Sequence, residues 1–289
     1  MSKRAKSLTP SGYLRRIFLG RIFGRADPLR RMKSVLSAEL TADTAWLHGD
    51  RNLAKLDGDY YRHWKTVGGG HKVYSYFDTY ERVFSSFRGR PLSVLEIGVF
   101  KGASLRTWRW YLGDQARIVG LDIDPDCARF DDPSNGMHVR IGDSGDLGVL
   151  EAIAAEFGPF DIVIDDGSHY THHQLLAFNT LFARHLKPGG IFFIEDTCTS
   201  AWHRFRTSRY SVFDLAKTMV DAINYFYFRY RYAAYDEATY GGPFSLPKIT
   251  TQVRELRVFD SAIAICKADA GYYPPLVFQR EVGERETAG

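Results

Sequence analysis

Residues 92–98 read LSVLEIG, a short apolar run that ends in an acid and a glycine. Stretches with helical periodicity separate it from four further runs of this kind: ARIVGLDID (116–124), MHVRIGD (137–143), FDIVIDD (160–166) and GGIFFIED (189–196). Strands that alternate with helices at this spacing predict a mostly parallel sheet with helices on both faces. The last run, VRELRVFDSAIAICK, predicts two antiparallel strands with a tight turn at Asp260 and Ser261, which makes seven strands.

The composition is that of a globular protein. The chain has 289 residues, of which 45% are hydrophobic and 25% charged, enough for one large domain with appendages. No apolar run approaches the roughly 20 residues of a membrane span, and no signal peptide opens the chain. We therefore expect a cytoplasmic protein. Its three cysteines are far apart in sequence, which argues against a disulfide framework or a zinc site.

Ligands of parallel α/β sheets bind beyond the carboxyl ends of the strands. Each predicted strand ends at or near an acid, so one edge of the sheet collects Glu96, Asp122, Asp143, Asp166 and Asp196.

The stretch LEIGVFKGAS, residues 95–104, carries Gly98 and Gly102 where a strand turns into a helix. Glycines there let the backbone approach a ligand closely. The spacing is GxxxG, not the GxGxxG of dinucleotide folds, and the acid Glu96 would repel a pyrophosphate. A cationic ligand fits better, and a sulfonium cofactor with a free amino group meets that description. The alternative is a purely structural turn.

Two further acids suit a nucleoside. Asp122 ends the second strand, where a carboxylate can accept both ribose hydroxyls of an adenosine, in NAD as in S-adenosylmethionine. Asp143 or Ser144 could bind the adenine edge, or could equally cap the next helix.

Asp166 and Asp196 end neighbouring strand runs with one helical crossover between them, so their carboxylates could converge on one ion. Oxygen ligands of this kind suit a hard divalent cation, Mg²⁺ above all. His169, three residues past Asp166, could then act as a base beside a substrate hydroxyl. Two alternatives stay open at this point: chelation through Asp165 and Glu195, or a hydrated strand edge without metal.

The motifs together resemble class I S-adenosylmethionine-dependent methyltransferases with a Rossmann-like fold, over about residues 70–268. YERVF, LEIGVFKGASLRTWRWYL, GLDIDP, DDGSH, LKPGGIFFIEDTCTS and LRVFDSAIAICK are similar to the macrocin and mycinamicin O-methyltransferase family, whose metal-dependent enzymes methylate sugar hydroxyls. The pattern also resembles that of mycobacterial enzymes that methylate the sugars of glycolipids or polysaccharides.

The resemblance implies roles for individual residues. Asp166 and Asp196 would bind Mg²⁺, His169 would be the general base, and Glu81 of TYERVF would supply a third acid. Cys198 departs from the pattern, because related sequences often carry His there. The residues expected to contact S-adenosylmethionine are Glu96, Gly98, Gly102, Ser104, Asp122, Asp143, Ser144 and Asp165.

We expect four segments: a basic arm (1–34), a helical cap region (35–90), the cofactor-binding catalytic domain (91–275, with an aromatic insertion at 225–248) and a polar tail (276–289). The arm has ten Lys or Arg against one Asp, a net charge of +9. Because the whole chain has a net charge of +4, the rest of the chain carries 4 − 9 = −5. The arm could contact anionic lipid at a membrane surface or a long acidic partner, or it could be a solvated or subunit-packing arm. Nucleic acid is not an expected partner, since the basic excess is confined to the arm and no recognition module is present.

The predicted activity is methylation of a sugar hydroxyl on a glycoside, oligosaccharide, polysaccharide or glycolipid, by a homo-oligomer. Alternatives are a macrolide or other non-sugar hydroxyl, a NAD-dependent oxidoreductase, which Glu96 and the missing GxGxxG disfavour, and a non-enzymatic scaffold. The acceptor could stack on aromatic residues in 225–240 and on Tyr60, Tyr61, His63 and Trp64, or these rings could simply pack the core.

Overall fold

The computed structural model describes residues 28–41, 56–235 and 246–271. The chain divides into two compact units, Met1–Lys55 and Leu56–Gly289. The first unit contains α2 (Pro28–Val35) and α3 (Ala38–Thr41). Most of the predicted basic arm, the polar tail and residues 236–245 of the aromatic insertion lie outside the described residues.

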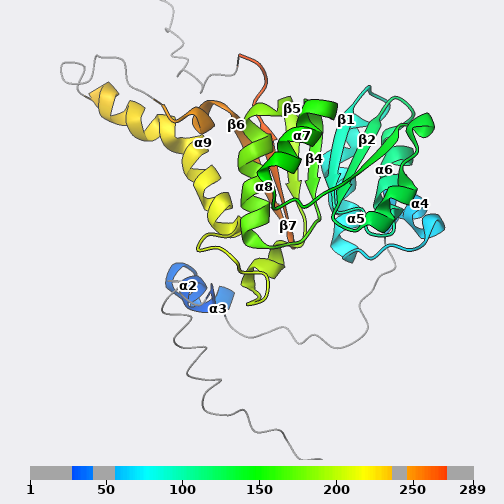
Figure 1. Ribbon diagram of the computed structural model, residues 1–289. Helices are drawn as coiled ribbons and strands as arrows, with labels where there is room; N and C mark the ends of the chain where they lie inside the picture. Colours follow the sequence, from blue (N-terminus) through cyan, green and yellow to red (C-terminus); the bar gives the residue numbers. More distant parts are fainter. Residues whose placement is uncertain (1–27, 42–55, 236–245, 272–289) are drawn as a thin grey trace, which may run out of the picture. The chain divides into compact units, whose positions relative to one another are not determined.

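The second unit is built on a seven-stranded sheet (Figure 1). Its strands are β1 (Ser93–Ile97), β2 (Arg117–Asp122), β3 (Met137–Ile141), β4 (Phe160–Asp165), β5 (Leu186–Ile194), β6 (Val253–Phe259) and β7 (Ala262–Lys267). They lie in the order β3-β2-β1-β4-β5-β7-β6. The first five are parallel, and β7 runs antiparallel to both β5 and β6. The predicted sheet and its closing hairpin are therefore confirmed.

Helices join and cover these strands. They are α4 (Asp59–Val67), α5 (Tyr74–Phe84), α6 (Ala103–Leu112), α7 (Leu147–Phe157), α8 (Thr171–Arg184) and α9 (Val212–Tyr235), with 3₁₀ turns η1 (Ser85–Phe87), η2 (Pro125–Phe130), η3 (Pro133–Asn135), η4 (Thr197–Ala201) and η5 (Lys248–Thr251). Because the compact unit begins at Leu56, α4 and α5 belong to the same body as the sheet.

Alternating side chains of each strand feed two separate cores, because successive residues of a strand point to opposite faces. Val94 and Ile118 pack in the core that contains residues of α4, α5 and α6. Leu95 and Val119, their neighbours in sequence, pack in the core that contains residues of α7, α8 and α9. This two-sided burial explains why the central strands are continuous apolar runs.

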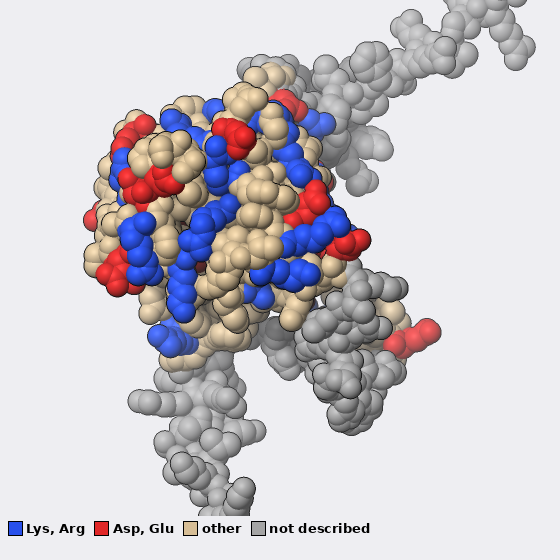
Figure 2. Space-filling model, turned by 90° about the vertical axis from the view of Figure 1, so that its right-hand side faces the viewer, with Lys and Arg blue, Asp and Glu red and all other residues tan. Residues whose placement is uncertain are grey.

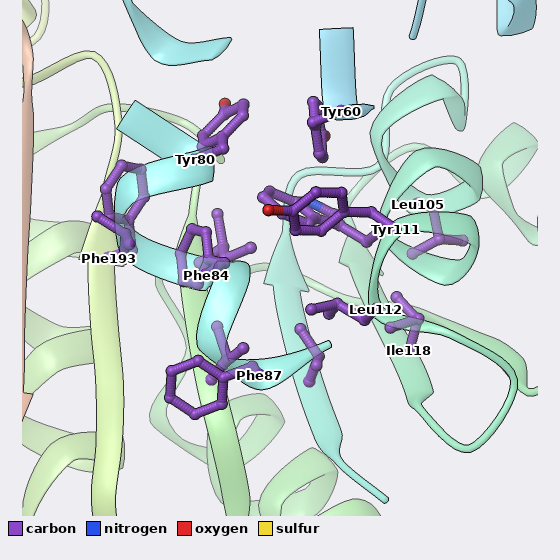
Figure 3. Packing of buried hydrophobic residues seen from close by; sticks show 14 of the residues in the cluster. Tyr60, Tyr80, Phe84, Phe87, Leu105, Tyr111, Leu112, Ile118 and Phe193 are labelled. Atoms are coloured by element: carbon purple, nitrogen blue, oxygen red, sulfur yellow. The ribbon is translucent and has the colours of Figure 1, made fainter. Parts of the chain in front are cut away.

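The core beneath α4, α5 and α6 is unusually rich in aromatic rings (Figure 3). Tyr60 is fully buried, with its ring centroid 4.7 Å from that of Tyr80 and 4.4 Å from that of Trp108. Phe84 and Phe193 extend the cluster onto β5, with their ring centroids 5.4 Å apart. Tyr60 is thus a packing residue, while the side chains of residues 226–245 are outside the description.

The surface carries both signs of charge. Figure 2 shows Lys and Arg side chains on one face with Asp and Glu side chains among them. Some form ion pairs, such as Arg140 with Glu156 and Arg88 with Asp59. In the described part of the chain, no helix combines the length and the apolar character that crossing a bilayer requires.

Candidate active site at the carboxyl edge of the sheet

The strand order reverses between β1 and β4, and an α/β sheet opens a ligand crevice at such a point. Backbone hydrogen bonds keep the strand ends in register there: the Asp166 N–H donates to the Ile97 carbonyl, and the Glu195 N–H donates to the Asp165 carbonyl. Glu96 near the end of β1 and the acids that end or follow β4 and β5 are therefore delivered to one edge.

Three of the predicted site residues are brought together. One ligand atom each from Asp166, His169 and Asp196 lies within 4.8 Å of the other two, and His169 Nε2 is 3.4 Å from Asp196 Oδ2. His169 and Asp196 adopt left-handed backbone conformations, with φ of 58° and 50°. Non-glycine residues pay a strain energy for this conformation, which is typical of functional sites. All three residues are half-buried.

Donors from α5 and the loop before it fix the acids from the other side. The Tyr76 hydroxyl donates to Asp196 Oδ1 at 2.6 Å and accepts from the Asp196 N–H at 2.9 Å. Lys72 Nζ lies 2.5 Å from Asp166 Oδ2 and 2.6 Å from Glu195 Oε2. Asp166 and Asp196 thus each have one carboxylate oxygen anchored by the protein.

Neither Asp165 nor Glu195, the alternative pair of ligands, belongs to this group. The second oxygen of Glu195 accepts from the Tyr80 hydroxyl at 2.6 Å, and burial, followed by the charge of Asp166, raises the pKa of its carboxyl. Burial also raises the pKa of Asp165, to about 7, and its Oδ1 accepts only a long bond, 3.4 Å, from the Gly167 N–H.

Glu81, the predicted third acid, lies away from this cluster. Its Oε1 accepts from the Tyr60 N–H and its Oε2 from the Tyr111 hydroxyl, both at 2.8 Å. The reason is helical geometry: Tyr76 and Tyr80 are four residues apart and share the face of α5 toward the acids, while the next residue along points about 100° away. Glu81 therefore ties α5 to α4 and α6.

The glycine loop passes very close to the strand beside it. Gly98 has a φ of 98°, and a Cβ there would lie 2.2 Å from the Asp166 carbonyl oxygen. Gly102, with a φ of 70°, stands directly before α6, and a Cβ there would lie 2.8 Å from the Phe130 ring. The loop needs both glycines for its own path, and that path links it to the Asp166 backbone.

Glu96 has the features of a receptor for a cation. It is fully buried; Trp108 Nε1 donates to its Oε1 at 3.2 Å, while its Oε2 has no hydrogen-bond partner. Burial raises the pKa of Glu96 to about 7, although Lys72, Ser104 and Trp108 oppose the rise. A buried carboxylate oxygen without a donor is costly, so this arrangement fits an ammonium group supplied by a ligand.

Asp122 holds the glycine loop in place. Its Oδ2 accepts from the N–H groups of Val99 at 2.7 Å and Phe100 at 2.9 Å, and its Oδ1 accepts from the Asp124 N–H at 2.9 Å. Partial burial alone would raise the pKa of Asp122, but these backbone donors outweigh it and lower the pKa. A carboxylate has about four lone-pair sites, so capacity for a ribose hydroxyl remains.

The third strand ends in a turn rather than a cap. Asp143 Oδ1 accepts from the Gly145 N–H at 2.8 Å, whereas the N-cap of α7 is Asp146, which accepts from the Gly148 N–H. The capping role considered for Asp143 and Ser144 is therefore filled by Asp146.

Comparison with known proteins agrees with this architecture. Residues 95–197 match a family model described as a methyltransferase domain. The fold is the Rossmann-like fold of class I methyltransferases. Among solved structures, the domain resembles MycE, a methyltransferase from the mycinamycin biosynthetic pathway, in complex with Mg, SAH and mycinamycin VI. The TM-score is 0.60 and the identity 28%, over 80% of this chain and 57% of MycE.

Two characterised relatives are similar in sequence to about half of this chain. An 8-demethyl-8-alpha-L-rhamnosyl tetracenomycin-C 2'-O-methyltransferase of Streptomyces olivaceus is 39% identical over 54% of this chain and 41% of its own length. Demethylmacrocin O-methyltransferase of Streptomyces fradiae is 37% identical over 50% of this chain and 39% of its own. The chain thus spans about two fifths of the relatives that it matches.

The sequence patterns missed several side chains of this site. Lys72 ends the stretch GGGHK (68–72), which has the pattern of a solvent loop. Tyr76 and Tyr80 have the pattern of ordinary core residues of an amphipathic helix. Phe205, whose ring centroid lies 6.0 Å from that of His169, and Trp202, which is 56% exposed, come from a segment after η4 that no motif marks.

Proposed function

We propose that this chain is an S-adenosylmethionine-dependent O-methyltransferase that methylates a sugar hydroxyl of a small-molecule glycoside, with Mg²⁺ held by Asp166 and Asp196. The observation that carries the proposal is the pairing of two features on neighbouring strands: the Asp166–His169–Asp196 group after β4 and β5, and the unpaired buried Oε2 of Glu96 on β1. The names of two relatives support it: one is a 2'-O-methyltransferase of a rhamnosyl tetracenomycin-C, and the other is a demethylmacrocin O-methyltransferase.

The residues fit a hard divalent cation. Asp166 offers Oδ1 and Asp196 offers Oδ2, while the other oxygen of each is anchored by Lys72 or Tyr76. Carboxylates held by hydrogen bonds to a second layer of residues are typical of protein metal ligands. When bound, Mg²⁺ supplies a Lewis acid that lowers the pKa of a coordinated hydroxyl. Glu81, tied to Tyr60 and Tyr111, would need to leave both partners to join this group.

The residues also fit the cofactor. Glu96 would accept a hydrogen bond from the amino group of the methionine moiety at Oε2, with Ser104 close by. Gly98 and Gly102 would let the backbone approach the ligand, Asp122 would accept from the ribose, and Asp143, Ser144 and Asp165 would line its remaining polar edges. Fixing donor and acceptor in one crevice is the proximity contribution to catalysis.

His169 would remove the acceptor proton. Its Nε2 lies 3.4 Å from Asp196 Oδ2 and so faces the acid cluster, and this atom would take up the proton. The Phe205 ring beside His169 and the exposed Trp202 offer apolar faces of the kind on which sugar C–H groups stack. Cytoplasmic location, a homo-oligomeric state and membrane contact through residues 1–34 stay predictions from the sequence.

The test is transfer of a labelled methyl group to a panel of acceptors that includes rhamnosides, a glycosylated macrolide and a phenol. We expect transfer to a glycoside, with His169→Ala abolishing turnover but preserving the affinity for SAH measured by calorimetry. His172→Ala is the matched control, because this neighbouring histidine bonds Thr207 instead. Binding of NAD but not SAH would overturn the proposal, as would full turnover by His169→Ala.

A further inference from the structure

Lys72 is a cation buried among acids. Its side chain is 3% exposed, and its ammonium lies within 2.6 Å of carboxylate oxygens of Asp166 and Glu195, the residues directly after β4 and β5. A buried Lys is rare unless it is paired, and here one ammonium serves two carboxylates.

The lysine reaches the sheet from outside it. It belongs to the loop between α4 and α5, where Gly68 and Gly69 have φ of 66° and 79°. A Cβ at Gly70 would lie 2.0 Å from the Trp64 ring. Only glycine fits these conditions, so the loop is shaped to fold inward and deliver Lys72 to the acids.

The ammonium leaves the proposed metal ligands partly free. It takes Oδ2 of Asp166 and leaves Oδ1, while Tyr76 takes Oδ1 of Asp196 and leaves Oδ2 near His169. Glu195 is outside the ligand group, since Lys72 and Tyr80 hold its two oxygens. Lys72 and Glu195 therefore form a charge-balanced pair that directly adjoins the ligands.

We propose that Lys72 is the resident cation of this acid cluster: it neutralises the carboxylates before a divalent cation enters and weakens the binding of that cation afterwards. The inference rests on the metal site of the proposed function. Its physical basis is that carboxylates crowded in a buried place repel one another unless a positive charge compensates them. Once a divalent cation arrives, the same fixed positive charge repels it. Lys72 is thus a positioning residue that sets the metal affinity.

Lys72 could instead have a purely structural role. A double-mutant cycle with Glu195 distinguishes that role from the electrostatic role proposed here. Removing the charge of Lys72 alone should tighten metal binding, and removing that of Glu195 alone should weaken it. Removing both restores the charge balance and should return the affinity close to that of the wild type. If Lys72 only oriented Asp166, its removal would loosen metal binding in both backgrounds.

The experiment is a titration of the full chain with Mn²⁺, with free Mn²⁺ measured by electron paramagnetic resonance and no cofactor present. We expect Lys72→Gln to lower the Kd at least tenfold, Glu195→Gln to raise it at least tenfold, and the double variant to lie within about threefold of the wild type. Lys65→Gln, which removes an exposed lysine of α4, should leave the Kd unchanged. An equal or higher Kd in Lys72→Gln overturns the inference.

Thermal unfolding of the metal-free protein provides the second measurement. Lys72→Gln should unfold at a lower temperature than the wild type, and Mn²⁺ should raise its Tm by more degrees than it raises that of the wild type. Should Lys72→Gln fail to fold, the Kd of the double variant against that of Glu195→Gln decides: an equal or higher value overturns the inference. A wild type that binds no Mn²⁺ refutes the metal site itself, whereas an unchanged metal-free Tm in Lys72→Gln refutes the resident cation alone.

Discussion

Two tyrosines of the aromatic core allow the same substitution, Tyr→Phe, to be made at a hydroxyl with a hydrogen-bond partner and at a hydroxyl without one. Tyr80 and Tyr60 are both fully buried, with ring centroids 4.7 Å apart. The Tyr80 hydroxyl donates to Glu195 Oε1 at 2.6 Å, whereas the Tyr60 hydroxyl has no hydrogen-bond partner. Substitution by Phe removes one oxygen atom in each case and keeps the ring.

The expected effects on stability differ in sign. A hydrogen bond to a charged group contributes roughly 1.5–3 kcal/mol, so Tyr80→Phe should lower the free energy of unfolding by about 2 kcal/mol. A buried hydroxyl without a partner costs roughly 1–3 kcal/mol, so Tyr60→Phe should raise it by about 1 kcal/mol. At roughly 2–4 °C per kcal/mol for a domain of this size, the two Tm values should differ by about 6–12 °C.

The assay is urea unfolding followed by far-ultraviolet circular dichroism, with calorimetric Tm values, on protein free of metal and cofactor. The slope of the free energy against urea should be the same in both variants, since the surface exposed on unfolding is unchanged. The reasoning is refuted if Tyr60→Phe is the less stable variant, or if both variants lie within about 0.5 kcal/mol of the wild type.

Two other substitutions probe the glycine loop and the buried acid. Gly98→Ala places a Cβ 2.2 Å from the Asp166 carbonyl oxygen and should weaken SAH binding at least 100-fold by calorimetry; Gly113→Ala, with the same φ of 98° but its nearest contact at 3.5 Å, should leave that affinity intact. The folded-state pKa of Glu96 is raised from 4.5 to about 7, so folding favours the protonated carboxyl. The contribution of Glu96 to the free energy of unfolding is therefore full below about pH 4.5 and is lost as the pH rises through 7, a difference of roughly 3 kcal/mol. Glu96→Gln should therefore remove this part of the fall in stability between pH 5 and pH 8, and weaken SAH binding; an unchanged pH dependence in chemical unfolding would contradict the assignment.

The sheet was predictable because its information is local. A strand buried on both faces needs an uninterrupted apolar run, and LSVLEIG and FDIVIDD supply it directly before their acids. Since parallel strands end at a common edge, the convergence of Asp166 and Asp196 follows from topology alone. The hairpin turn at Asp260 and Ser261 was equally predictable, because it directly connects two β-type runs with no helical pattern between them.

The anchors of the acids were not predictable, because they depend on contacts between distant parts of the chain. Lys72 meets residues 94 and 123 positions away, and Tyr76 meets one 120 positions away. Nothing near GGGHK distinguishes an inward loop from a solvent loop until Trp64 and the acids are in place. Glu81 illustrates the converse: its motif suggested a ligand, but its place on α5 turns it to Tyr111.

The position of α5 therefore decides the geometry of the site. One face of this helix presents Tyr76 and Tyr80 to the acids after β5, and the preceding loop presents Lys72. Another face carries Glu81 and Phe77, which bind the backbone and rings of α4. The sheet alone can bring carboxylates together, but it cannot stop them from repelling one another. Tyr76, Tyr80 and Lys72 donate the hydrogen bonds that offset this repulsion, and the aromatic core beneath α5 holds that helix in place. Packing far from any ligand therefore keeps the acids together at the edge of the sheet.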